Sequence, residues 1–120
     1  MPYVAPHPEL FLNKTFTHGD SVAFVSRAAT NLPGSVAWRP GRRVHAAEPG
    51  SIAKGTIIAT FDHGHFPAVG GHAAIYLSHD TNALHVIDQW QGRPVSYRRL
   101  HWHQGQGNVR NDGNSFYVIE

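Results

Sequence analysis

The sequence predicts an α+β domain in which one helix near the N-terminus packs on an antiparallel sheet. Apolar residues recur at helical spacing between Val22 and Leu32, and the apolar period changes to two after Gly55. The 120 residues contain no internal repeat and no low-complexity tract. We therefore expect a single domain over residues 1–120, long enough to bury its own core.

The predicted helix begins close to Ser21 and ends before Pro33-Gly34. Its apolar residues fall within an arc of about 120° on a helical wheel. They are Val22, Val25, Ala28, Ala29 and Leu32. Ser21 falls inside the same arc, so its side chain is expected to face the sheet. A serine in the first turn is also a common capping residue, which is the ordinary structural interpretation.

Five short segments with strand-like alternation follow a loop-rich stretch over residues 33–55. They are residues 56–61, 72–77, 83–88, 94–99 and 115–119. The lead-in over residues 2–17 contains three prolines and is expected to be irregular. Short connections between the strands favour antiparallel pairing.

Composition sets limits on function. The chain has no cysteine, so no disulfide forms, and no apolar run is long enough to span a membrane. Its first residues lack the basic and apolar regions of a secretory signal, so we expect synthesis in the cytoplasm without a leader. The net charge of +2 and pI near 9.3 fit solvated basic faces or attraction to an anionic polymer such as the bacterial wall. Aromatic residues do not interleave with the arginines, which argues against nucleic acid as the partner.

Three polar residues could meet in the predicted fold. The segments 72–77 and 83–88 suit a hairpin, and a symmetric register places His72 directly opposite Asp88. A strand-end histidine and a strand-end aspartate each have ordinary structural roles. Together with Ser21 at a helix start, however, they supply a nucleophile position, a base and a residue that orients the base.

The segments that carry these residues resemble the papain-like NlpC/P60 and CHAP amidases. GDSVAFV (19–25) resembles the G-x-C-V-A-x-V start of their catalytic helix, and GGHAAIYL (70–77) resembles the strand with their catalytic histidine. VIDQW (86–90) is similar to the next strand, which carries the third polar residue. WRPGRRV (38–44) and GTIIATF (55–61) are similar to a narrower group, the third family of type VI secretion amidase effectors.

This resemblance implies a papain-like fold and a peptidoglycan peptide amidase that needs no cofactor or metal. It implies cleavage of the cross-link between D-alanine and meso-diaminopimelate in wall stem peptides. Such an effector is delivered by the type VI apparatus into the periplasm of a rival cell and is neutralised by a cognate immunity protein. By position, Ser21 takes the place of the nucleophile, His72 that of the base and Asp88 that of the orienting residue.

Serine at position 21 departs from the cysteine of the family pattern. A thiol ionises near pH 8.5, whereas a hydroxyl must lose its proton as it attacks, so a site shaped for a thiolate is a poor serine hydrolase. Three interpretations follow: an engineered replacement, a natural pseudoenzyme, or a true Ser-His-Asp enzyme. We favour the engineered, inactivated form because the rest of the constellation is intact.

Two other classes of function are compatible with the residues. Histidine pairs at 63/65 (His63, His65) and 101/103 (His101, His103) could belong to a zinc-dependent hydrolase, although no H-E-x-x-H motif occurs. Alternatively, the basic pI and the tryptophans would suit a non-catalytic wall-binding module.

Substrate-binding residues are expected among the basic and aromatic side chains. Arg42 and Arg43 lie in a glycine-proline loop that could border the cleft and hold substrate carboxylates. Trp90, which follows Asp88 closely, is the third candidate.

Overall fold

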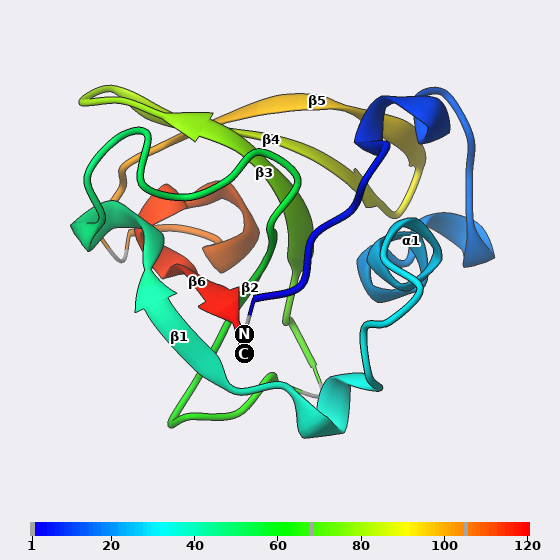
Figure 1. Cartoon of the computed structure of the whole chain (residues 1–120), viewed down its shortest axis with the longest axis horizontal. Helices are drawn as coiled ribbons and strands as arrows, with labels where there is room; N and C mark the ends of the chain where they lie inside the picture. The colour runs from blue at the N-terminus through cyan, green and yellow to red at the C-terminus, as the bar shows by residue number, and fades with distance from the viewer. Residues whose placement is uncertain (1, 68, 105) are drawn as a thin grey trace.

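The computed structural model describes residues 2–67, 69–104 and 106–120. Within these ranges a six-stranded antiparallel sheet has the order β1-β6-β2-β3-β4-β5, and helix α1 (Ser21–Ala28) packs against it (Figure 1). The strands are β1 (Pro40–Arg43), β2 (Ile57–Thr60), β3 (Ala73–His79), β4 (Ala83–Trp90), β5 (Arg93–His101) and β6 (Phe116–Ile119). Short 3-10 turns fill the connections: η1 (Pro8–Phe11), η2 (Thr17–Gly19), η3 (Ser35–Ala37), η4 (Val44–Ala46), η5 (Val109–Asn111) and η6 (Gly113–Ser115). The predicted α+β class with one helix on an antiparallel sheet is confirmed.

Helix α1 is shorter than the sequence indicated. Asp20 caps its start by accepting a hydrogen bond from the Val22 amide at 2.9 Å. The helix ends at Ala28, because Ala29 adopts an extended conformation with φ −125° and ψ 93°. Thr30 and Asn31, which follow, are weak helix formers, and they outweigh the apolar spacing that continues to Leu32.

The sheet buries apolar side chains on both faces. One cluster lies between α1 and the sheet, and it includes Phe24, Val25, Ile57, Ile75 and Ile87. A second cluster covers the opposite face, and it includes Val44, Ile58, Tyr76, Leu84 and Phe116. Neighbouring residues of a strand point to opposite faces, so β2, β3 and β4 contribute to both clusters.

All five predicted strands are present, and β1 is an additional one. Its sequence, PGRR, has low strand propensity, so alternation could not reveal it. β1 forms at the edge of the sheet, where it pairs with β6 through Pro40↔Ile119 and Arg43↔Tyr117. Proline is tolerated there because an edge strand leaves some backbone amides unpaired.

The register between β3 and β4 differs from the symmetric one that the sequence suggested. Ile75 pairs with Ile87 and Tyr76 with Val86, and an irregularity follows before Ser78. Continuing this ladder places Asp88 across from Ala74, so the expectation that Asp88 directly opposes His72 is wrong. The shift amounts to two residues, which leaves both side chains on the same face of the sheet.

The short turn between β3 and β4 and the irregularity between Tyr76 and Ser78 together produce this shift. Next to the turn, His79 pairs with Leu84, about three residues from the symmetric register, and the irregularity reduces the offset by one. The Asp80 carboxylate accepts hydrogen bonds from the amides of Asn82 and Ala83 at 2.8 and 2.9 Å. This turn extends β3 to His79, beyond its expected end.

No helix in the described ranges is long and apolar enough to cross a lipid bilayer.

Candidate active site

Ser21 is the first residue of α1, and its side chain faces inward as the helical wheel predicted. The residue is 7% exposed, and its Oγ accepts a hydrogen bond from the Ala73 amide at 3.2 Å. A pocket of about 370 Å³ opens beside it. The other residues that line this pocket are Asp20, Val22, Ser35, Val36, Phe66, Pro67, Gly70 and Gly71.

The start of α1 is held in place by Gln89 of β4. The Gln89 side chain is fully buried; its Oε1 accepts from the Phe16 amide at 2.8 Å, and its Nε2 donates to the carbonyls of Phe16 and Asp20 at 2.7 and 2.8 Å. Gly19 allows this close approach, because it has φ +94° and a Cβ there would lie 2.7 Å from the Trp90 carbonyl oxygen. Ser21 is therefore fixed relative to β4.

His72 and Asp88 form a buried pair. His72 Nε2 lies 2.7 Å from Asp88 Oδ2, and the two residues are 3% and 0% exposed. The His72 backbone is held by β2, since its amide donates to Thr60 Oγ1 at 3.0 Å and its carbonyl accepts from the Thr60 amide at 2.9 Å. The carboxylate therefore reaches the imidazole diagonally across the β3–β4 ladder, which long side chains can do.

Ser21 is hydrogen-bonded to the backbone next to His72. Its Oγ accepts a hydrogen bond from the amide of Ala73, the residue that follows His72. Within the described part of the chain, no hydrogen bond joins Ser21 Oγ to the His72 ring. Because Asp88 engages Nε2, Nδ1 is the ring nitrogen left for exchanging a proton with the nucleophile.

Arg98 of β5 continues the row formed by His72 and Asp88. Its Nε lies 3.0 and 2.9 Å from the two carboxylate oxygens of Asp88, and its Nη2 lies 2.8 Å from Oδ2. His72 directly precedes β3, and Asp88 and Arg98 lie on the adjacent strands β4 and β5. Sequence reasoning did not identify Arg98 or Gln89 as part of the site.

The ring of Trp90 packs against Arg98, the last residue of this row. Three guanidinium groups approach its ring, those of Arg93, Arg98 and Arg110, with distances of 5.7, 5.2 and 4.6 Å to the ring centroid. Its indole Nε1 is buried and has no hydrogen-bond partner in the described residues. Its contacts therefore support the arginine that holds Asp88, and its role in substrate binding stays a prediction.

The structure separates Arg42 from Arg43. Arg43 lines a pocket of about 550 Å³ that shares Pro67 and Gly70 with the pocket beside Ser21. Its Nε donates to the Asn114 carbonyl at 2.9 Å, and its guanidinium lies 5.9 Å from the Tyr117 ring centroid. Arg43 is thus placed next to the candidate cleft.

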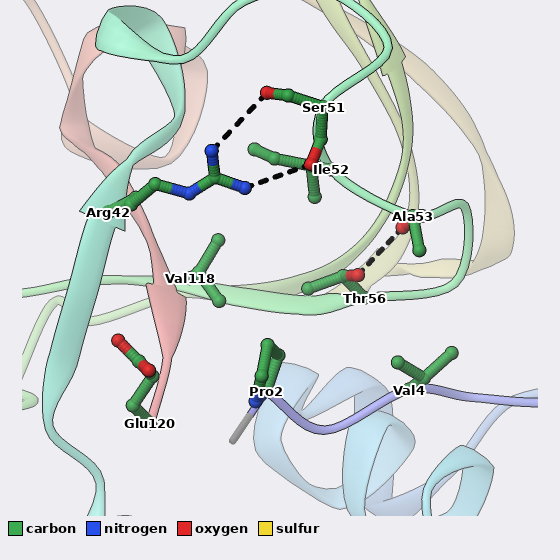
Figure 2. Close-up of a pocket in the computed structure, with 9 residues that line it drawn as sticks. All are labelled: Pro2, Val4, Arg42, Ser51, Ile52, Ala53, Thr56, Val118 and Glu120. Atoms are coloured by element: carbon green, nitrogen blue, oxygen red, sulfur yellow. Dashed lines mark hydrogen bonds between the residues drawn. The ribbon is translucent and has the colours of Figure 1, made fainter.

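Arg42 points into a different cavity. Its Nη2 donates a hydrogen bond to the Ser51 carbonyl at 2.9 Å (Figure 2). The cavity has a volume of about 620 Å³ and lies near both chain termini. Neither Ser21 nor His72 lines this cavity. The structure therefore does not bring Arg42 together with the candidate catalytic residues.

The histidine pairs are dispersed. His63 Nδ1 lies 2.9 Å from the carboxylate of its neighbour Asp62, and the His63 side chain is highly exposed. The rings of His101 and His103 lie 6.3 Å apart. In the ranges that the structure describes, no three side chains of His, Cys, Asp or Glu gather to hold a metal ion.

Comparisons with known proteins give the family of this chain. The family model described as "Domesticated amidase effector 2" matches residues 8–119. A protein of that name from Ixodes scapularis is 35% identical over 102 residues, which cover 84% of this chain and 70% of the relative. The "Type VI secretion amidase effector 2 protein" of Salmonella typhi is 37% identical over 81 residues, which cover 63% of this chain.

A solved structure of "Type 6 secretion amidase effector 2 (Tae2)" has the same fold, with a TM-score of 0.81 and 26% identity over 100% of this chain and 95% of that one. The match to the Salmonella protein spans 59% of that relative's length. These findings confirm the resemblance to type VI amidase effectors. They also correct the group of effectors that was expected: the matching proteins are named amidase effector 2, whereas the sequence motifs indicated the third family. The chain belongs to the domesticated amidase effector 2 family.

Proposed function

We propose that this chain is a peptidoglycan peptide amidase whose nucleophile position is Ser21. The single observation that carries the proposal is the buried His72–Asp88 pair beside the start of α1, where Ser21 borders an open pocket. Family membership supports the same chemistry, because the relatives are named amidase effectors.

The proposed reaction is acyl transfer, and it is written for a form with cysteine at position 21. The thiolate attacks the carbonyl carbon of a stem-peptide amide, and the C–N bond breaks as His72 gives a proton to the leaving amine. A water molecule then attacks the thioester; His72 takes its proton, the C–S bond breaks and the thiolate leaves, which restores the starting protonation states. Asp88 holds the imidazole with its proton on Nε2, which keeps Nδ1 directed to the nucleophile.

Two features of the site favour an anionic nucleophile. The Ala73 amide already donates to Oγ at 3.2 Å, and it would donate to a thiolate in the same position. The first turn of α1 adds its dipole, which favours negative charge at the helix start. The backbone amide of residue 21 is proposed to provide part of the oxyanion hole.

Serine at position 21 makes this form slow or inactive. The hydroxyl is not ionised at neutral pH, and in the described structure it is not hydrogen-bonded to the His72 ring that would have to take its proton. A thiol needs a weaker base, because it ionises near pH 8.5. We propose that the cysteine form is the active one and that Ser21 replaces it.

The proposed substrate is the peptide cross-link between D-alanine and meso-diaminopimelate. Stem peptides carry several carboxylates, and Arg43 lies one pocket away from Ser21, with its Nε fixed by the Asn114 carbonyl. Its Nη atoms can then receive a substrate carboxylate at a defined distance from the nucleophile. The proposal also includes delivery by the type VI apparatus, action in the periplasm of a rival cell and inhibition by an immunity protein.

The second candidate is a non-catalytic protein that binds the wall through the same cleft. It is favoured by one observation, the hydroxyl in place of a thiol at position 21. A binding module of this kind would retain the pocket beside Ser21 and the arginine-bearing pocket beyond Pro67.

Purified muropeptides distinguish the two candidates. The Ser21→Cys variant is incubated with cross-linked dimers, and mass spectrometry identifies the products. Conversion of dimers to monomers by Ser21→Cys supports the amidase. A folded Ser21→Cys protein that retains muropeptides without cutting them would favour the binding module.

A further inference from the structure

We infer that Arg98 is a positioning residue of the proposed amidase site: it fixes the Asp88 carboxylate against His72 and balances its charge. As a statement about catalysis this rests on the proposed function. The geometry itself does not, because it concerns how three side chains of the resting protein are held.

Arg98 balances the charge of the Asp88 carboxylate. Asp88 is completely buried, and a carboxylate at such a depth requires a cation or several donors. Arg98 contributes three of the contacts to this carboxylate, at 3.0, 2.9 and 2.8 Å, and its own side chain is only 14% exposed. Arg98 therefore supplies the positive charge that the buried carboxylate beside the imidazole requires.

Arg98 also fixes the orientation of the Asp88 carboxylate. Oδ2 of Asp88 is shared between His72 Nε2 at 2.7 Å and the Arg98 guanidinium, so the direction of one hydrogen bond is coupled to the other. Arg98 is itself anchored, since Nη1 donates to Asn111 Oδ1 and Nη2 to the Arg110 carbonyl, both at 2.9 Å. A planar guanidinium held at several points is a rigid support for a carboxylate.

The other side chains beside His72 are uncharged. Thr60 of β2 accepts a hydrogen bond from the His72 amide, and the ring of Phe116 of β6 has its centroid 6.3 Å from that of the imidazole. Among the described residues, Asp88 is the charged side chain hydrogen-bonded to the imidazole ring, and Arg98 holds Asp88. The orientation of the ring therefore depends on Asp88, and through Asp88 on Arg98.

The test reads the tautomer of the His72 ring by ¹⁵N NMR on the full chain, which requires no turnover. In Arg98→Gln the carboxylate loses the group that fixes it, so we expect the ring to change from the Nε2-protonated tautomer to a mixture of both. Arg98→Lys retains the charge, but a lysine lacks the planar fork, so the ring should still show a mixture of tautomers, with more of the Nε2-protonated form than in Arg98→Gln.

Arg93→Gln is the matched control. Arg93 also lies against the Trp90 ring, at 5.7 Å, but no hydrogen bond or ion pair joins it to Asp88 in the described residues, so the His72 ring should keep the tautomer of the unaltered chain. An unchanged tautomer in a folded Arg98→Gln protein would overturn the inference. If that variant does not fold, Arg98→Lys decides, and an unchanged tautomer there would overturn it equally.

A kinetic comparison separates this inference from the proposed function. In the Ser21→Cys background, Arg98→Gln should lower kcat while KM changes little. An inactive Ser21→Cys protein combined with the expected change of tautomer would refute the amidase and leave the role of Arg98 in place.

Discussion

The buried side chain of Gln89 offers a quantitative test of how the sheet positions Ser21. Replacement by leucine preserves the approximate volume and removes three hydrogen bonds, to the amide and carbonyl of Phe16 and to the carbonyl of Asp20. Each such bond contributes about 1 kcal/mol net, so Gln89→Leu should lower the free energy of unfolding by about 3 kcal/mol.

Urea denaturation followed by circular dichroism measures this change, provided that the slope with denaturant is unchanged. Gln91→Leu is the control, because Gln91 is exposed in the following turn, and its change should stay within about 0.5 kcal/mol. If Gln89→Leu lowered the free energy of unfolding by less than about 1 kcal/mol, the reasoning would be refuted. That result would mean that the three hydrogen bonds between Gln89 of β4 and the segment before α1 are not formed.

Three further predictions concern other parts of the chain. Gly19→Ala should destabilise the fold, because the new Cβ would lie 2.7 Å from the Trp90 carbonyl oxygen at a φ of +94°; thermal unfolding checks it, and an unchanged melting temperature would contradict it. Hydrogen bonds from the amides of Asn82 and Ala83, and then from His85, lower the pKa of Asp80 from 3.8 to about 2. The stability that this carboxylate contributes is present above the unfolded pKa and is lost as the pH falls from about 4 towards 2, so Asp80→Asn should lose less stability than the unaltered chain in that window. Equal acid profiles would rule this out. Finally, metal analysis should find no stoichiometric zinc, whereas one bound zinc per chain would revive the metallohydrolase.

Helical spacing and strand alternation were sufficient to predict the class of the fold. The α1 face, five strands and the pairing of residues 72–77 with residues 83–88 follow from local periodicity, which reflects the burial of one side of each element. β1 was missed because a Pro-Gly-Arg-Arg strand has no such periodicity, and it forms only through its pairing with β6.

The candidate site was partly predictable. Ser21, His72 and Asp88 were found from motif and face, and an error of two residues in register did not change which face carries His72 and Asp88. Arg98 and Gln89 were missed because their partners lie on other elements, namely Asp88 on the neighbouring strand and Phe16 in the lead-in. A buried charge such as that of Asp88 implies a cation, and that requirement was the available signal for Arg98.

The separation of Arg42 from Arg43 has a similar cause. Adjacent residues of a strand point to opposite sides, so only one of the two can face the cleft once residues 40–43 form β1. The sequence placed both in a loop, where this constraint does not apply. Their division between two cavities follows from the strand itself.

The most direct test of the central claim compares the rates of three proteins on one cross-linked muropeptide. They are the unaltered chain, Ser21→Cys, and Ser21→Cys combined with His72→Ala. If the site is an amidase centre silenced at its nucleophile, Ser21→Cys should cleave at least about 100-fold faster than the unaltered chain, and removal of His72 should abolish that gain. A folded Ser21→Cys protein no faster than the unaltered chain, or one whose activity survives the loss of His72, would contradict the account.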